Sequence, residues 1–141
     1  MSNNLTLTLA RYAASTTCAD IPADVKERAK QVIFDEIAGA YFSRRSLAGD
    51  LGARYAAQAG GNPEAHIYAT GQRVSAPNAA LANGAAGHGE EVDGAHVVGG
   101  HPAASIVHAA VATAERQRAT GADLLNAVVL GFDVGIRVIE S

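Results

Sequence analysis

A helical repeat of apolar residues after Pro22 constrains the fold of this chain more than any other feature of its sequence. Apolar side chains recur every three or four residues over about five turns, as expected for a helix with 3.6 residues per turn. They are Val25, Ala29, Val32, Ile33, Ile37, Ala40 and Tyr41, and the opposite face carries Asp24, Glu27, Arg28, Gln31 and Asp35. Pro22 suits the first turn because its missing N–H would be unpaired there. An amphipathic helix of this length must bury one face, so the pattern predicts helices packed on helices.

The rest of the chain also predicts helices, separated by short breaks. We expect them over residues 5–14, 47–59, 75–86, 101–118 and 124–139, with Gly60-Gly61 ending the second of these. Thr120 and Asp123 have the spacing of a capping box that would start the last helix. Residues 65–74 are rich in extended formers, and Gly71 suits a tight turn, so a small β-hairpin is expected there. The prediction is an all-α helical bundle of about six or seven helices in a single domain, residues 1–141.

Alanine and glycine fill the expected core more than large side chains do. The chain is 48% hydrophobic but only 5% aromatic, and it contains no Trp. Small side chains let helices approach closely, so we expect tight helix contacts rather than a core of bulky residues. At 141 residues the chain is long enough for one domain with a core and too short for two.

The charge balance and the cysteine content exclude several classes of partner. A net charge of −3 provides no basic surface for nucleic acid or an anionic membrane. No segment approaches the roughly 20 apolar residues of a membrane span, and the N-terminus lacks the pattern of a secretory signal. The single Cys18 cannot form an internal disulfide and has no zinc-ligand spacing around it. We therefore expect a cytoplasmic protein that binds neither nucleic acid nor membrane.

The segment from Asn83 to Pro102 concentrates the groups that can transfer protons or bind anions. Its sequence is NGAAGHGEEVDGAHVVGGHP, with three of the five histidines, three carboxylates and several glycines. Carboxylates so closely spaced would not suit a buried helix without partners. A polar, glycine-rich segment between two apolar helices is where a substrate pocket is expected.

His101, Asp93 and Glu91 are the candidate proton-transfer groups of this segment. His101 precedes Pro102 at the expected start of a helix, where the helix dipole attracts anions. Glu91 and Asp93 are two residues apart, so on extended backbone both would face one side and could take part in acid–base chemistry. The alternatives are a structural turn histidine and a solvated acidic loop.

His88, His96 and Asn83 are candidates for binding the substrate. For each of them a structural alternative remains open. His88 could pack or orient a neighbour, His96 could be exposed, and Asn83 could cap or hold a helix.

A metal centre is a rival use of the same atoms. The histidines and carboxylates of the segment could supply three or four nitrogen and oxygen ligands: His88, Glu91, Asp93, His96 and His101. Their spacing matches no compact signature such as H-E-x-x-H, so we expect no metal and no cofactor.

Several short motifs follow one another in a defined order along the second half of the chain. They are Asn83-Gly84, His88, Asp93, His101-Pro102, Ala114-Glu115 and the closing run from Gly131 to Arg137. In this order and spacing they resemble the N-terminal part of the MmgE/PrpD family, whose pattern is roughly N-G-x-x-x-H-x-x-D-x-D-D-T followed by H-P. That family includes 2-methylcitrate dehydratase, cis-aconitate decarboxylase and an iminodisuccinate epimerase. The resemblance implies a bundle like the N-terminal part of the family's helical domain.

The chain departs from the family pattern at three positions. Glu91 stands where the family tends to have its first Asp, and Gly94 and Ala95 replace an Asp and a Thr that lie at the substrate in relatives. Family members are also much longer, with later sequence that completes the helical domain and adds an α+β lid domain and active-site lysines. Lys26 and Lys30 fall on the solvated face of an early helix, so they cannot take the place of those lysines. We therefore expect an incomplete helical domain without the lid.

The resemblance implies the N-terminal portion or a subunit of a lyase or isomerase. Such an enzyme would act by proton transfer next to a carboxylate of a small di- or tricarboxylate, through dehydration, decarboxylation or epimerisation. The implied catalytic residues are His101, Asp93 and Glu91, and the implied substrate-binding residues are His88, His96 and Asn83. The alternative is a non-catalytic helical interaction or structural subunit derived from the same scaffold, which the replaced Asp and Thr favour.

The last expected helix indicates that the chain associates. Apolar residues cover most of its circumference: Leu124, Leu125, Val128, Val129, Phe132, Ile136 and Ile139. If half of these side chains remained in water, the apolar patch would be about at the limit that a stable monomer exposes. We expect a homo-oligomer, or a hetero-oligomer with a chain that supplies the missing lysines and lid.

Overall fold

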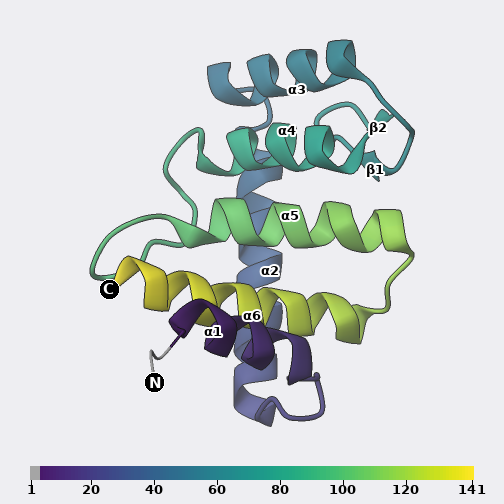
Figure 1. Ribbon diagram of the computed structural model, residues 1–141. Helices are drawn as coiled ribbons and strands as arrows, with labels where there is room; N and C mark the ends of the chain where they lie inside the picture. The colour runs from purple at the N-terminus through teal and green to yellow at the C-terminus, as the bar shows by residue number, and fades with distance from the viewer. Residues whose placement is uncertain (1–3) are drawn as a thin grey trace.

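The computed structural model describes residues 4–141, which form six α-helices and a two-stranded sheet (Figure 1). The helices are α1 (Leu5–Ser15), α2 (Ala23–Ser43), α3 (Leu47–Ala59), α4 (Ala76–His88), α5 (Pro102–Gln117) and α6 (Gly121–Ile139), and the strands are β1 (Ala65–His66) and β2 (Arg73–Val74). The predicted all-α class with a small β-hairpin is confirmed. Each predicted helix is present, and α3 has the predicted bounds.

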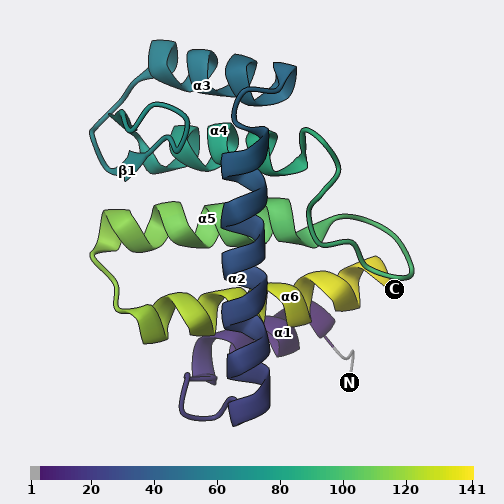
Figure 2. The same ribbon diagram turned by 180° about the vertical axis from the view of Figure 1, so that it is seen from behind.

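The long helix α2 crosses the other helices instead of lying alongside them. Figures 1 and 2 show α3, α4, α5 and α6 stacked one after another, with α2 running across the stack. It contacts α4, α5 and α6. Three of its four buried residues are small, namely Ala29, Ala40 and Ser43, and the fourth is Glu36. Small side chains let α2 approach three helices at once, so it joins elements that are far apart in the sequence.

The core beneath α3, α4 and the hairpin consists mostly of alanine. Its buried members are Ala53, Ala56, Ala65, Ile67, Val74, Ala76, Ala79, Ala82 and Ala112. Helices α3 and α4 approach so closely that a Cβ on Gly52 would lie 3.0 Å from the Cβ of Ala85. The structure therefore has the close helix contacts that the composition predicts.

The hairpin between α3 and α4 is short and is held by α4 and α5. Its strands pair antiparallel, with Ala65 opposite Val74, and Gly71 takes a left-handed φ of 72° in the turn. Glu115 of α5 accepts hydrogen bonds from the backbone N–H and the ring of His66, at 3.0 and 2.7 Å. These contacts attach the hairpin to α5.

Helix α6 begins and packs as the sequence predicts. Thr120 Oγ1 accepts from the Asp123 N–H at 3.2 Å, and Asp123 Oδ2 accepts from the Thr120 N–H at 2.9 Å, so the predicted capping box is confirmed. A Cβ on Gly131 would lie 2.6 Å from Ile106 Cγ2 of α5. Gly131 is therefore required for the close packing of α6 on α5.

The buried face of α2 differs from the predicted one at both ends and in the middle. Val25 is 38% exposed and Tyr41 is 48% exposed, so neither is a core residue. Glu36, by contrast, is 2% exposed. Most of the buried positions where the helices cross hold small side chains, and the bulky Val25 and Tyr41 are exposed. Glu36 is the exception, and its partner is described below.

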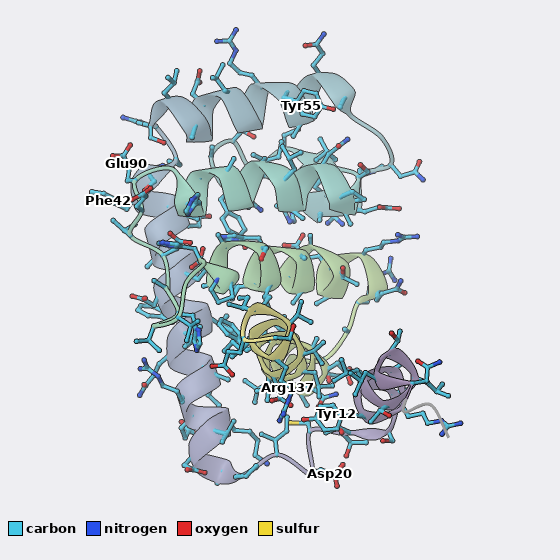
Figure 3. All side chains as sticks on the ribbon, turned by 60° about the vertical axis from the view of Figure 1, so that its left-hand side comes forward. Tyr12, Asp20, Phe42, Tyr55, Glu90 and Arg137 are labelled. Carbon is cyan, nitrogen blue, oxygen red and sulfur yellow. The ribbon has the colours of Figure 1, made fainter. Side chains whose placement is uncertain are left out.

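Large apolar side chains remain on the surface of several helices. Phe34, Phe42 and Leu47 are between 73% and 77% exposed. Figure 3 shows Phe42 and Tyr55 extending outward from α2 and α3. No helix within residues 4–141 is long and apolar enough to cross a membrane. Exposed apolar surface is thus spread over several elements and is not confined to α6.

Candidate functional site

The polar segment forms a loop between α4 and α5, with a histidine at each end. His88 is the last residue of α4, and His101 is the N-cap of α5, with Pro102 as its first residue. The loop folds back on itself because the His96 N–H donates to Gly100 O at 3.0 Å. Gly99 and Gly100 have φ values of 146° and 81°, a conformation that side chains disfavour. The loop therefore returns the chain so that the two helix ends lie close together.

Asp93 joins the two histidines at the centre of this loop. Its Oδ1 atom lies 3.1 Å from the Nδ1 of His88 and 3.1 Å from the Nδ1 of His101. The two imidazole rings meet edge to face, with centroids 4.9 Å apart. The Asp93 side chain is 1% exposed, whereas those of His88 and His101 are 51% and 33% exposed. A buried carboxylate thus holds two solvent-accessible imidazoles.

The contacts with Asp93 bear on which nitrogen of each ring carries the proton. An ionised carboxylate can only accept hydrogen bonds, so each neutral imidazole must carry its proton on Nδ1, the atom that faces Asp93. The Nε2 atom of each ring then keeps its lone pair and is free to accept a proton. Asp93 also stabilises either ring once it is protonated. The cluster can therefore exchange protons with a molecule that reaches the Nε2 atoms.

An open pocket of about 630 Å³ lies beside the cluster. It is lined by Ala80, Leu81, Gly84, Ala85, His88, Gly100, His101, Ala104 and Ser105. The N-terminus of α5 lies at this pocket, and its unpaired N–H groups favour anions. Lys and Arg are absent from this lining in the part of the chain that the structure describes. The pocket offers proton transfer and hydrogen bonding, but little positive charge.

Glu91, the other predicted catalytic carboxylate, does not face the same side as Asp93. Glu91 has a φ of 52° and is exposed, while Asp93 is buried. The expectation of a shared face assumed extended backbone, and the left-handed turn at Glu91 breaks that alternation. Its catalytic role remains a prediction, without support from this geometry.

His96 and Asn83 lie outside the cluster. The Nε2 atom of His96 is 3.7 Å from Glu140 at the end of α6. Asn83 is 3% exposed, accepts from the Tyr68 N–H at 2.9 Å and donates to His66 O at 2.9 Å. The Asn83 amide therefore attaches the hairpin to α4, which is a structural role. Substrate binding by these two residues remains a prediction.

The cluster is also the set of donors that a metal ion would use. Among the described residues, one potential ligand atom from each of His88, Asp93 and His101 lies within 4.8 Å of the others. Imidazole and carboxylate suit several divalent ions. Both Nδ1 atoms already face Asp93, so an ion bound there would have to replace two hydrogen bonds.

A second histidine–carboxylate pair was missed by the sequence analysis. His108 Nε2 of α5 lies 3.0 Å from Glu36 Oε1 of α2, and the two side chains are 0% and 1% exposed. A signal was present: Glu36 occupies the helical spacing of Ala29, Ala40 and Ser43. Histidine at position 108 follows His101 by two helical turns, so both lie on one side of α5.

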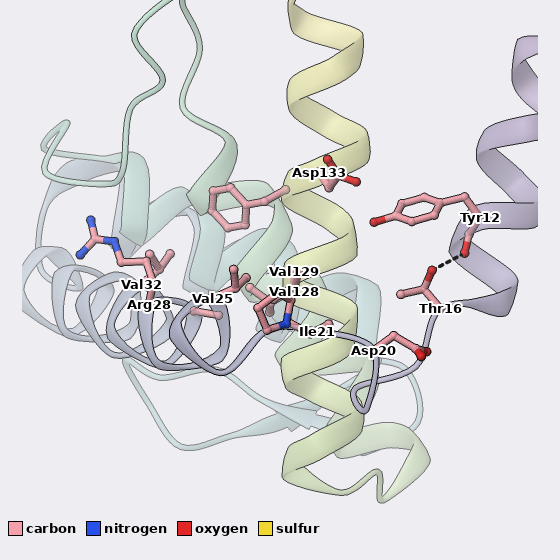
Figure 4. A pocket seen from close by; sticks show the side chains of 13 residues that line it. Tyr12, Thr16, Asp20, Ile21, Val25, Arg28, Val32, Val128, Val129 and Asp133 are labelled. Atoms are coloured by element: carbon pink, nitrogen blue, oxygen red, sulfur yellow. Dashed lines mark hydrogen bonds between the residues drawn. The ribbon is translucent and has the colours of Figure 1, made fainter.

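A further pocket, between α1, α2 and α6, has a different character. It measures about 640 Å³ and is lined mainly by apolar side chains, with Tyr12 and Asp133 facing each other across it (Figure 4). The nearby Asp133 carboxylate raises the pKa of Tyr12. The lining includes no residue from the polar loop within the described chain. This pocket therefore does not belong to the candidate site.

Together these features define an all-α domain that presents a carboxylate-bound pair of solvent-accessible imidazoles beside an open pocket. The chain belongs to the MmgE/PrpD family, because the sequence profile of the MmgE/PrpD N-terminal domain matches residues 7–141. The predicted family is therefore confirmed.

Two curated relatives extend this result. Both are called cis-aconitate decarboxylase, one from Aspergillus terreus strain NIH 2624 / FGSC A1156 and one from Aspergillus terreus. Each is 29% identical over 142 residues, covering 96% of this chain. The chain spans only 29% of the length of each relative. No solved structure matches the chain significantly.

Proposed function

We propose that this chain is the N-terminal helical part of a lyase or isomerase that acts on a small di- or tricarboxylate. The reaction would move a proton at a carbon next to a carboxylate. The observation that carries this proposal is the placement of Asp93 between His88 and His101 beside an open pocket. Membership of the MmgE/PrpD family supports the reaction class.

In this proposal the two imidazoles transfer protons and Asp93 orients them. The neutral Nε2 of His101 takes a proton from the substrate carbon, and the resulting imidazolium is stabilised by Asp93. His88 is the second acid or base, since its Nδ1 has the same partner at the same distance. The predicted roles of Glu91, His96 and Asn83 are not needed for these steps.

The name of the two relatives makes cis-aconitate the first substrate to test. In a decarboxylation the bond between a substrate carbon and its carboxylate breaks, and carbon dioxide leaves. The electron pair of that bond stays on the substrate. An imidazolium then gives its Nε2 proton to the substrate carbon and returns to the neutral form. Charge and protons balance without an oxidant or a reductant.

A substrate with two or three carboxylates needs more positive charge than this pocket offers. The chain's two lysines are engaged elsewhere: Lys26 Nζ donates to Cys18 O at 3.2 Å, and Lys30 lies 2.6 Å from Glu27. The proposal therefore includes association with further sequence that supplies cations, either as a longer form of this chain or as a second polypeptide. Cations at the substrate would also stabilise charge that develops during the reaction.

The test is turnover by the complete assembly, with cis-aconitate and 2-methylcitrate each followed by proton NMR. We expect consumption of at least one of them, and a loss of about 10²- to 10⁴-fold in His101→Ala. His66→Ala is the matched control, because His66 contacts Glu115 outside the site. Rapid turnover by residues 1–141 alone would contradict the need for further cations. An assembly that forms but is inactive on carboxylates would favour the non-catalytic subunit.

A further inference from the structure

The pair formed by Glu36 and His108 is sealed inside the protein, where three helices meet. Glu36 comes from α2 and His108 from α5. Within the described chain, Glu36 Oε2 and His108 Nδ1 are buried without a hydrogen-bond partner. Burying polar groups with incomplete pairing costs free energy, and apolar residues of similar volume often replace such a pair without loss of stability. Stability alone therefore explains this pair poorly.

Gly87 of α4 is the third member of this contact. A Cβ on Gly87 would lie 2.5 Å from Glu36 Oε1 and 2.7 Å from His108 Nε2, the two atoms that join the pair. Neither side chain can move aside easily, because both are buried. The pair thus contacts the backbone of α4 at one defined point.

This contact point lies directly behind the candidate site. Gly87 immediately precedes His88, and His108 follows His101 by two turns of α5. Gly84, which lines the pocket, is also near His108, since its Cβ would lie 3.9 Å from His108 Cδ2. The end of α4 that carries His88 therefore lies against the buried pair, and α5 contributes His108 to that pair two turns after His101.

We propose that Glu36 and His108 are positioning residues that set the separation of α4 and α5 at which His88 and His101 both reach Asp93. The hydrogen bond between Glu36 and His108 links α2 to α5. The contact of this pair with Gly87 sets the distance of α4 from both helices. A change of about 1 Å in this separation would break one of the two 3.1 Å contacts to Asp93. The proposed function enters this proposal only as the role of the site. The positions of the two imidazoles do not depend on it.

Imidazole NMR tests this proposal without a substrate. In the chain labelled with ¹⁵N-histidine, long-range proton–nitrogen spectra report which ring nitrogen of His88 and His101 carries the proton. Gly87→Ala places a methyl group between the paired atoms, and Glu36→Leu removes the acceptor. We expect both variants to lose the Nδ1–H signature of at least one site histidine. Glu36→Gln, which keeps an oxygen acceptor for His108, should retain both signatures.

Gly121→Ala is the matched control, because a Cβ there meets no atom within 4 Å. It should leave both signatures unchanged. Unchanged signatures in a folded Gly87→Ala or Glu36→Leu variant would overturn the proposal. If both variants fail to fold, the double variant Glu36→Leu with His108→Leu decides: loss of a signature supports positioning, and retention of both overturns it. An inactive assembly whose imidazole signatures are intact would count against the proposed function alone.

Discussion

Two sets among the histidine–carboxylate contacts of this protein have similar lengths and opposite surroundings. In the loop between α4 and α5, His88 and His101 each lie 3.1 Å from Asp93. In the interior, His108 lies 3.0 Å from Glu36. The site imidazoles are 51% and 33% exposed, whereas His108 is fully buried. The same kind of bond between the same chemical groups is therefore found both at a pocket and in the core.

The difference shows that solvent access, and not the bond itself, separates a reactive histidine from a structural one. His88 and His101 use Nδ1 to bind Asp93, and both residues line the pocket. His108 uses Nε2 to reach Glu36, and its Nδ1 has no partner and no route to solvent. Proton exchange with a ligand requires an accessible atom, and of these two sets the loop cluster alone meets this requirement.

The largest expected effect is on activity and follows from replacing Asp93, the carboxylate that contacts both His88 and His101. Asp93→Asn should lower the activity of the complete assembly by about 10²- to 10⁴-fold, because an amide cannot hold both rings in the Nδ1–H tautomer. Initial rates with cis-aconitate measure this loss, and circular dichroism shows whether the fold is intact. Near-wild-type rates in Asp93→Asn would show that the contacts of Asp93 with the two imidazoles are not needed for activity.

The buried pair should respond in stability. His108→Leu leaves the Glu36 carboxyl group in the core without a partner, and we expect a loss of about 3–5 kcal/mol in the free energy of unfolding. The double variant with Glu36→Leu should recover much of this loss, because both polar groups are then gone. Urea denaturation of the wild type and the three variants gives the coupling energy. A single variant as stable as the wild type would show that the pair is not needed for the fold.

Chemical modification compares the two environments in one experiment. Diethylpyrocarbonate acylates accessible imidazole nitrogens, so His88 and His101 should react in the native state while His108 stays unmodified. Peptide mass spectrometry reads all sites at once, with exposed His66 as the internal standard. Modification of His108 before unfolding would contradict its burial.

The smallest expected effect concerns a third carboxylate contact, which is fully exposed. Hydrogen bonds from Thr120 hold the pKa of Asp123 below its ordinary value of 3.8. A lowered pKa in the folded state contributes stability above pH 3.8 that is lost as the pH falls through the folded value. Thr120→Ala should lower stability by about 1 kcal/mol near neutral pH and flatten this acid dependence. Thermal unfolding of both proteins from neutral to acidic pH measures the difference.

Periodicity and caps predict most of this fold from the sequence alone. The bounds of α3, the capping box at Thr120 and the small hairpin all follow from local rules about turns, caps and side-chain spacing. Small residues also predict close helix contacts, as at Gly131. These features depend on neighbours in the sequence, so local patterns are sufficient to find them.

The site is only partly predictable, because it depends on where the loop brings the chain. The sequence names His88, Asp93 and His101 among its candidates, yet nothing local shows that Asp93 bonds both rings. Glu91 was expected beside Asp93, and a single left-handed φ places it elsewhere. Glu36 was overlooked because a carboxylate on an apolar face has no local explanation. Its partner is 72 residues away.

The separation of Glu36 and His108 in the sequence affects the order in which the chain can fold during synthesis. A ribosome adds about 5–20 residues per second, so Glu36 is synthesised about 4–14 seconds before His108, which follows it by 72 residues. Over this interval Glu36 has no partner, and the face of α2 that α5 and α6 will cover remains in water. The unit of α3, the hairpin and α4 uses nearby sequence and can form first. We expect α2 to dock late and the nascent chain to be a substrate for chaperones until it does.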